Sequence, residues 1–151
     1  MNTLYLLVGL PGSGKSTYAT TLSSKLKNST LRSNDNLRTE LLGDIENQEH
    51  NAEIGDLCQS LVIADLYAGK DVIFDATNLY RKHRKEFLQK LSLIQCKKIC
   101  IYLKAPVETC WTRTIKRGRE VPYDTILRMH DRMRVPSEDE GWDSIEVIEN
   151  F

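Results

Sequence analysis

The sequence predicts a single α/β domain built on a mostly parallel sheet of four to five strands, with helices on both faces. Three observations lead to this fold class. The chain has 151 residues, which suits one domain of ordinary size. Short apolar runs alternate with longer helical patterns, and this alternation is typical of βαβ units. A glycine-rich motif directly follows the first apolar run, where such domains turn from strand into helix.

The expected strands are short and spread along the whole chain. The first is a continuous apolar run that ends at Gly9, and the second is less apolar than the others. The five runs occupy residues 4–8, 30–33, 71–75, 98–103 and 145–148. Their spacing leaves room for a helix between successive strands, which predicts parallel pairing.

Helical patterns fill most of the intervals between these strands. They lie near residues 15–27, 47–68, 79–93, 106–117 and 123–134. Gly69 stands where the second pattern should end, and Pro106 where the fourth should begin. The chain contains no repeat, low-complexity stretch or linker, so we expect residues 1–151 to form one domain.

Composition excludes several classes of protein. Hydrophobic residues make up 40% and charged residues 28% of the chain, as in folded globular proteins. No apolar run approaches the roughly 20 residues that a membrane span needs, and the first residues do not resemble a signal peptide. We therefore expect a cytoplasmic protein with reduced cysteines and no membrane partner. The four cysteines form no C-x-x-C pair and the three histidines do not cluster with them, which argues against a zinc site or a disulfide framework.

The net charge of zero conceals an uneven distribution. Residues 1–75 contain six basic and ten acidic side chains, residues 76–135 fifteen and five, and residues 136–151 none and six. The basic middle segment could face a polyanion, or it could contribute to the mixed-charge surface that neutral proteins have. The charge pattern leaves both interpretations open.

Residues 9–16 match the phosphate-binding pattern G-x-x-x-x-G-K-[ST] in full, between an apolar strand and a helix. Glycines let successive backbone N–H groups point inward, and the following helix adds its positive N-terminal end. Lys15 can then reach the β- and γ-phosphates of an NTP, and the Ser16 hydroxyl can hold Mg²⁺. A glycine-rich turn without a ligand is the alternative. The candidate donor-binding residues are Gly9, Pro11, Gly12, Ser13, Gly14, Lys15, Ser16 and Thr17.

Two acidic residues follow expected strands at their carboxyl ends, where ligands of parallel sheets bind. Asp35 follows the second strand and could deprotonate an acceptor hydroxyl during phosphoryl transfer. It could instead cap the helix that follows. Asp75 ends the third strand and could contact the Mg²⁺ site or serve as a turn residue.

An arginine-rich segment around residues 111–122 is a candidate lid over the phosphates. Arg113 and Arg117 are four residues apart, so they share one face of a helix that Gly118 can end. Two like charges at this spacing repel each other, which favours an anionic ligand between them. A solvated basic face is the alternative.

Taken together, these motifs resemble the kinase domain of bacteriophage 5′-polynucleotide kinases and related P-loop enzymes of nucleic-acid end repair. The resemblance extends over most of the chain. It rests on GLPGSGKSTYA, NDNLR, DATNLYRKHR, RTIKRGREVP and EGWDSIEVI, in that order along the sequence.

The resemblance assigns roles to individual residues. It implies that Asp35 is the general base on the acceptor hydroxyl and that Arg38 contacts an acceptor phosphate. It also implies that Arg117 engages the phosphate donor, with Arg113 on the same helical face. The family role of Asp75 carries over less directly.

The expected function is therefore transfer of the γ-phosphate of ATP, with Mg²⁺, to 5′-hydroxyl ends of RNA or DNA. A P-loop kinase of a nucleoside, sugar or antibiotic is the first alternative, because a fold does not determine a substrate. The second alternative is a nucleotide-dependent binding subunit without transfer activity.

Overall fold

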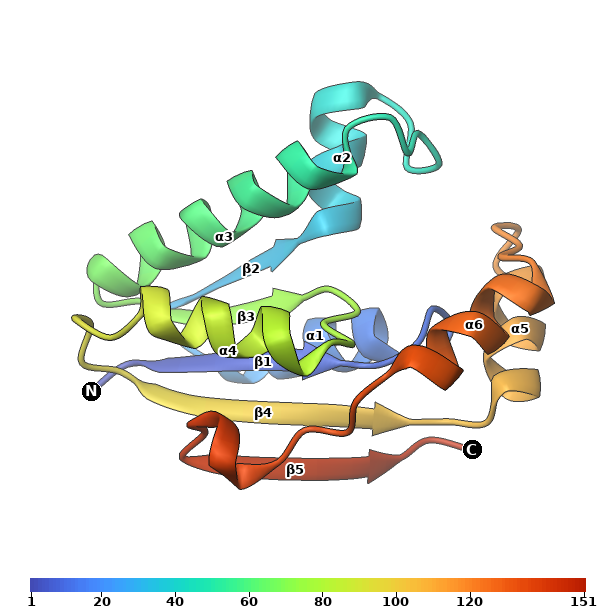
Figure 1. The fold of residues 1–151 in the computed structure, drawn as a ribbon. Helices are drawn as coiled ribbons and strands as arrows, with labels where there is room; N and C mark the ends of the chain where they lie inside the picture. Colours follow the sequence, from blue (N-terminus) through green and yellow to red (C-terminus); the bar gives the residue numbers. More distant parts are fainter.

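Five parallel strands form the sheet at the centre of the protein (Figure 1). The computed structural model describes residues 1–151. Along the chain the strands are β1 (Thr3–Val8), β2 (Ser29–Ser33), β3 (Asp71–Asp75), β4 (Lys97–Lys104) and β5 (Ser144–Glu149). Their order across the sheet is β2-β3-β1-β4-β5. The predicted fold class is confirmed, and each expected strand lies within one residue of its observed bounds.

Six α-helices connect and flank the strands. They are α1 (Lys15–Lys25), α2 (Asn34–Leu42), α3 (Asn51–Tyr67), α4 (Arg81–Lys90), α5 (Val107–Lys116) and α6 (Tyr123–Arg132). Five of them correspond to predicted helices. The sixth, α2, was not among the predicted helices. It begins after Ser33, whose hydroxyl accepts a hydrogen bond from the Asn36 amide at 3.2 Å, and it ends at Gly43, whose φ is +73°.

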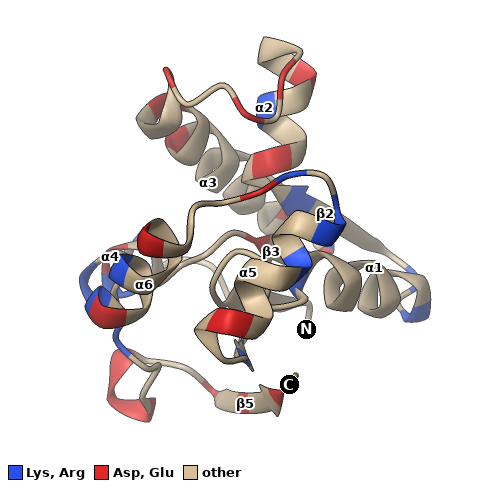
Figure 2. Ribbon diagram, turned by 90° about the vertical axis from the view of Figure 1, so that its right-hand side faces the viewer, with Lys and Arg blue, Asp and Glu red and all other residues tan.

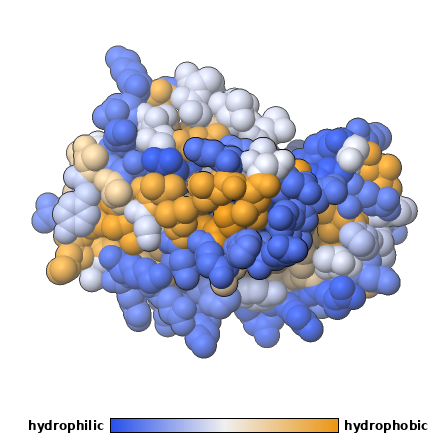
Figure 3. All heavy atoms as spheres, turned by 90° about the horizontal axis from the view of Figure 1, so that it is seen from above, coloured by the Kyte–Doolittle hydropathy of each residue, from blue (hydrophilic) through white to orange (hydrophobic).

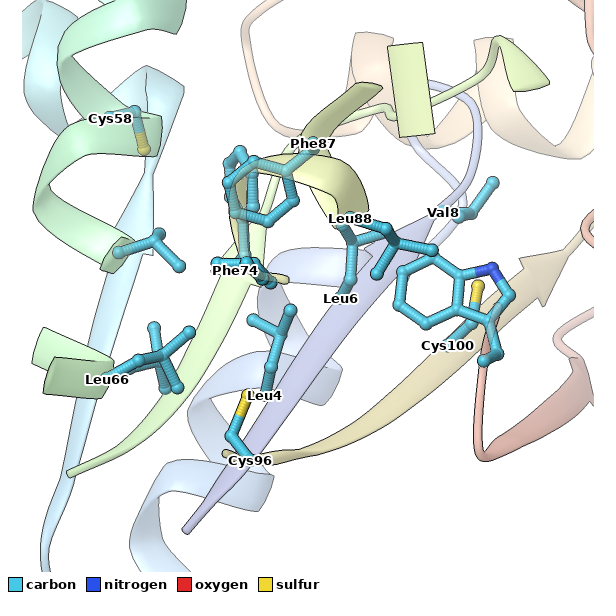
Figure 4. Packing of buried hydrophobic residues seen from close by; sticks show 14 of the residues in the cluster. Leu4, Leu6, Val8, Cys58, Leu66, Phe74, Phe87, Leu88, Cys96 and Cys100 are labelled. Atoms are coloured by element: carbon cyan, nitrogen blue, oxygen red, sulfur yellow. The ribbon is translucent and has the colours of Figure 1, made fainter. Parts of the chain in front are cut away.

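The helices cover both faces of the sheet (Figure 1). Successive strand residues point to opposite faces, so Leu4, Leu6 and Val8 of β1 join one core while Leu7 joins the other. The first core lies under α3 and α4, and Figure 4 shows Phe74 and Phe87 packed edge to face within it, 5.4 Å between ring centroids. The second core is covered by α1. A strand buried on both faces has to be apolar throughout, which explains the continuous run at residues 4–8.

α3 is the most apolar of the helices, and part of its outer face is exposed. Figure 3 looks down on the face of the protein where α3 lies and shows an apolar band across it. Leu57 is 40% and Tyr67 70% exposed on this helix. None of the helices combines the length and the apolar character that crossing a membrane would require.

The acidic tail folds back onto the basic helix α4. Arg84 is fully buried and forms a two-pronged ion pair with Glu140, at 2.8 and 2.9 Å, and it also donates to the backbone carbonyls of Asn78 and Arg134. Arg81 pairs with Asp139 at 2.8 Å. Part of the charge that is separated along the sequence is thus neutralised in the fold.

The topology creates a crevice at one edge of the sheet. After β1 the chain crosses to the face covered by α1, whereas after β3 it crosses to the face covered by α4. Connections that leave neighbouring strands toward opposite faces open a space beyond their carboxyl ends. The segments that follow β1, β2 and β3 all border this space.

Candidate active site

A polar cleft of about 580 Å³ lies beyond the carboxyl ends of β1, β2 and β3. Figure 2 looks toward this side of the protein, where basic and acidic segments of α2, α5 and the α5–α6 connection come together. The cleft is lined by Pro11, Gly12, Gly14, Lys15, Ser16, Asn34, Asp35, Arg38, Glu46, Gln48, Asp75, Ala76, Thr77, Arg117, Arg119, Glu120, Val121, Pro122 and Thr125. Four segments that are distant in the sequence, residues 11–16, 34–48, 75–77 and 117–125, thus contribute to the wall of one cleft.

The glycine-rich loop forms an anion cradle at one end of the cleft. Gly12 and Gly14 have φ values of +81° and +98°, in the left-handed region that glycine adopts without strain. Gly14 is the N-cap of α1 and has no side chain to cap it. The first N–H groups of α1 therefore have no partner within the helix and can receive an anion.

The loop is held from behind by α5 and the C-terminal segment. A methyl group on Gly12 would collide with the carbonyl oxygen of Cys110, so only glycine allows α5 to pack this closely. Arg113 donates to the carbonyls of Gly12 at 3.4 Å and Asn150 at 2.8 Å, while the Asn150 amide donates to the Ser13 carbonyl at 2.9 Å. Arg113 does not line the cleft, so its charge supports the loop from outside.

Lys15 lies in the centre of this cradle, and its ammonium group donates to the Leu10 carbonyl at 2.9 Å. Burial lowers the pKa of Lys15, while the carboxylates of Asp75 and Asp35 act in the opposite direction. The loop thus holds a cation in a site poor in water, where its attraction to a phosphate is stronger than at the surface.

Ser16 and Asp75 meet at the floor of the cleft, where the Ser16 hydroxyl donates to the Asp75 carboxylate at 2.9 Å. Burial raises the pKa of Asp75, and the nearby Lys15 ammonium partly offsets this effect. A hydroxyl and a carboxylate are hard oxygen donors of the kind that Mg²⁺ takes. No group of three or more His, Cys, Asp or Glu side chains forms a metal cage. These two residues suit an Mg²⁺ ion that draws its other ligands from nucleotide phosphates and water.

The segment that follows Asp75 forms the next part of the cleft wall. Asn78 adopts a φ of +46°, and its side-chain amide donates to the Leu7 carbonyl of β1 at 2.8 Å. The Thr77 carbonyl accepts from the Gly9 amide at 3.1 Å. These bonds tie the end of β3 to the beginning of the glycine-rich loop and set the position of Asp75 relative to Ser16.

Asp35 lies at the other end of the cleft, in the first turn of α2. The Asp35 carboxylate accepts from Arg38 at 2.7 Å and from two nitrogens of Arg119, at 3.0 and 3.3 Å. Ser33 provides the N-cap of α2, so the interpretation of Asp35 as a helix cap is wrong. Because the Asp35 and Arg119 side chains are 39% and 31% exposed, an ion pair of this kind contributes about 0.2–1 kcal/mol to stability.

Arg38 is largely buried and connects Asp35 to the rim of the cleft. It donates to the Asn51 side chain at 2.9 Å, and Asn51 in turn donates to Gln48 at 2.9 Å. The Arg38 Nε atom is buried and has no partner. The guanidinium group is thus held in place on one side and retains an unused donor.

Arg117 lines the cleft at the end of α5, and its guanidinium group has no hydrogen-bond or ion-pair partner. Its positive charge acts on both Lys15 and Asp75, lowering the pKa of each. A free cation near the phosphate cradle can turn toward a bound phosphate.

The structure therefore brings most of the sequence-predicted site residues together. Pro11, Gly12, Gly14, Lys15, Ser16, Asp35, Arg38, Asp75 and Arg117 line one cleft. Thr17, Ser13, Gly9 and Arg113 do not line it; Ser13 is buried behind the loop and its hydroxyl has no partner. Sequence reasoning missed Arg119, Gln48 and Glu46. Only Arg119 carried a signal, because it follows the glycine that ends the arginine-bearing helix.

A model of the family described as "AAA domain" matches residues 4–136, which include the cradle, both acidic residues and the arginine-rich segment. The chain belongs to this AAA domain family. The match covers the first four of the five motifs, and the last one, at residues 140–148, lies beyond it.

Two curated relatives share sequence with this AAA domain. L-seryl-tRNA(Sec) kinase of Methanococcus maripaludis is 29% identical over 143 residues, which cover 93% of this chain and 56% of the relative. Transcription factor bHLH140 of Arabidopsis thaliana is 35% identical over 149 residues, which cover 93% of this chain and 15% of that protein. The chain thus spans about half the length of the first relative and a small part of the second.

Solved structures place this AAA domain among P-loop kinases by fold. A chain of the Pnkp1/Rnl/Hen1 RNA repair complex is 29% identical, with a TM-score of 0.69 over 87% of this chain and 43% of that one. A putative kinase from Chloroflexus aurantiacus reaches a TM-score of 0.77 at 18% identity, over 98% of this chain and 85% of that one. The family resemblance drawn from the motifs is confirmed at the level of a P-loop kinase domain.

Proposed function

We propose that the protein is an ATP-dependent kinase that transfers the γ-phosphate to 5′-hydroxyl ends of RNA or DNA. One observation carries this proposal: a single cleft holds a complete phosphate cradle at one end and the Asp35 carboxylate with two arginines at the other. An NTP-binding site that only senses nucleotide needs no second, acceptor-like end.

The residues divide the work of phosphoryl transfer between the two ends. Lys15 and the N-terminal amides of α1 hold the β- and γ-phosphates, and Arg117 adds positive charge over the transferred group. Asp35 accepts the proton of the acceptor hydroxyl. As this happens, the hydroxyl oxygen bonds to the γ-phosphorus, and the bond from that phosphorus to the β,γ-bridging oxygen breaks. Ser16 and Asp75 would hold Mg²⁺, which would further neutralise the phosphate charge when bound.

Two of the similar proteins support an RNA or DNA acceptor. One lies in an RNA repair complex, and the other is a kinase of a seryl-tRNA by its name. Both are more than 25% identical to this chain. The motif resemblance to polynucleotide kinases and the excess of basic residues at 76–135 support the same acceptor class.

A small-molecule acceptor is the second candidate, and the rim of the acceptor end favours it. Glu46, Gln48 and Glu120 line the cleft there and bring two carboxylates close to where a polyanion would enter. Hydrogen-bonding acids and amides also suit an acceptor rich in hydroxyl groups. The structures of a gluconokinase and a sugar kinase share the fold with this chain, at 14% and 20% identity.

The direct test is incubation with γ-labelled ATP, Mg²⁺ and a 5′-hydroxyl oligonucleotide, beside a panel of nucleosides and sugars. The proposal predicts label on the oligonucleotide and little on the panel. A second measurement varies the salt concentration. Because phosphate contacts release counterions, KM for an oligonucleotide should rise steeply with ionic strength, whereas KM for a neutral acceptor should not. Label on small molecules alone would contradict the proposal, and ATP binding without any transfer would indicate a binding subunit.

A further inference from the structure

Arg119 occupies a position that its local backbone determines. Gly118 has a φ of +72° and ends α5, with its amide bonded to the Ile115 carbonyl and the Arg119 amide bonded to the Thr114 carbonyl. This pair of bonds is a Schellman motif, which turns the chain sharply away from the helix axis. The buried Thr114 hydroxyl then accepts a hydrogen bond from the Val121 amide at 3.2 Å. Arg119 is thus presented to the cleft from a turn that is anchored on both sides.

The guanidinium group of Arg119 covers the carboxylate that the proposed reaction needs. Its two Nη atoms contact the two oxygens of Asp35 at 3.0 and 3.3 Å, in the parallel geometry of a fork, and Arg38 takes one of the same oxygens at 2.7 Å. These three bonds occupy most of the roughly four acceptor sites of the carboxylate, so a hydroxyl that approaches Asp35 has to compete with Arg119 for it. Arg119 and Asp35 are also partly exposed, so a ligand can reach and replace their contact.

From this geometry we infer that Arg119 is a specificity-determining residue that withholds Asp35 from water and neutral hydroxyls. It releases Asp35 only to an acceptor that carries a phosphate near its hydroxyl. Two oxygens of a tetrahedral phosphate can accept both donors of the guanidinium fork, as a carboxylate does, and a phosphate carries a larger negative charge, so it can take the guanidinium group from Asp35. A water molecule or a sugar hydroxyl carries no charge and cannot. This inference deepens the proposed function and rests on Asp35 being the base there.

The reaction that Arg119 would suppress is hydrolysis of bound ATP. In that reaction the oxygen of a water molecule bonds to the γ-phosphorus, the bond from that phosphorus to the β,γ-bridging oxygen breaks, and the proton of water passes to Asp35 and on to solvent. The products are ADP and inorganic phosphate. Because Arg119 engages both oxygens of Asp35, this water has to compete for the base, and bound ATP is hydrolysed slowly until an acceptor binds.

The first measurement is release of inorganic phosphate from Mg·ATP without any acceptor, in wild type, Arg119→Ala and Arg119→Lys. We expect Arg119→Ala to hydrolyse ATP at least about tenfold faster, which is less than the roughly 10²–10⁴ that a fully available general base contributes, because Arg38 still holds Asp35. Arg119→Lys keeps the charge but loses the fork, so its rate should lie between the two. Lys116→Ala is the matched control, because it removes an exposed cation from the same segment outside the cleft and should leave the rate unchanged.

The second measurement compares a nucleoside 3′-phosphate with the corresponding nucleoside as acceptors, each offering a 5′-hydroxyl. The ratio of their kcat/KM values should fall in Arg119→Ala, because the neutral acceptor now finds Asp35 uncovered. Thermal melting of each variant checks that the fold is retained. If no 5′-hydroxyl is phosphorylated by wild type, the proposed function fails, while phosphate release still tests the role of Arg119.

Two results would overturn the inference. Unchanged phosphate release and an unchanged acceptor ratio in Arg119→Ala would leave Arg119 as a structural ion pair of the cleft rim. Slower phosphate release in Arg119→Ala would show that Arg119 stabilises the charge of the transferred phosphate rather than guarding the base.

Discussion

Replacing Asp35 by Asn tests whether this carboxylate is the base of the reaction. Asn keeps the size of the side chain and one oxygen that can still accept from Arg38, but it removes the negative charge. The cap of α2 is not affected, because the Ser33 hydroxyl provides it at 3.2 Å from the Asn36 amide. The substitution therefore separates chemistry from helix formation.

The structural cost of Asp35→Asn can be estimated from the contacts of the carboxylate. Losing the charge in the first turn of α2 costs about 0.3–1 kcal/mol, and weakening the exposed pair with Arg119 costs about 0.2–1 kcal/mol. Turning the charge-assisted bond from the buried Arg38 into a bond to a neutral amide costs about 1 kcal/mol. The free energy of unfolding should thus fall by about 1.5–3 kcal/mol, which lowers Tm by roughly 3–12 °C for a domain of this size.

The kinetic effect should be much larger than the structural one. Loss of a general base lowers the transfer rate by roughly 10²–10⁴, whereas binding of ATP should change little, since the phosphate cradle lies at the other end of the cleft. Purified wild type and Asp35→Asn would be compared by thermal melting, ATP titration and transfer to a 5′-hydroxyl oligonucleotide. Glu40→Gln is the matched control, because it removes an exposed carboxylate from the same helix outside the cleft. Transfer at the wild-type rate by Asp35→Asn would refute the role of Asp35 as base.

Four further substitutions test the other parts of the cleft. Lys15→Ala removes the buried cation of the cradle and should abolish transfer with the fold intact; near-normal turnover would mean that ATP binds elsewhere. Arg117→Ala should lower kcat far more than it raises KM for ATP, and lysine should restore only part of the rate, since the planar fork is lost; equal kcat in wild type and Arg117→Ala would make Arg117 a surface charge. Gly12→Ala places a methyl group against the Cys110 carbonyl at a φ of +81°, so it should lower Tm and weaken ATP binding together, and a normal Tm would contradict the close packing of α5. Because burial raises the pKa of Asp75, this carboxyl should be protonated at a higher pH than an exposed Asp, and Mg²⁺-dependent transfer should weaken as the pH falls through that range. Mg²⁺ titrations at a series of pH values should show this loss of transfer at low pH in wild type and not in Asp75→Asn.

The strands and the phosphate cradle could be predicted from the sequence because their signals are local. A buried parallel strand needs a continuous apolar run, and the run at residues 4–8 therefore identifies β1. The cradle needs glycine where φ is positive, so the positions of Gly12 and Gly14 already specify its backbone. The short helix α2 was considered only as the element that Asp35 could cap and gave no helical pattern, because its nine residues carry few apolar side chains; its cap at Ser33 and its end at Gly43 mark it in the structure.

The sequence by itself determined the fold class, the donor end of the cleft and the residues Asp35 and Asp75 at the ends of their strands. The tertiary structure decided which charges act together. Arg113 and Arg117 share a helix face in the sequence pattern, yet Arg113 holds the loop carbonyls while Arg117 lies free in the cleft. Arg119 meets Asp35 across 84 positions of the chain. Such pairings depend on how the helices pack against the sheet, because an ion pair forms wherever folding places two opposite charges within about 4 Å. The number of residues between two charges in the sequence does not determine the distance between them in the folded protein.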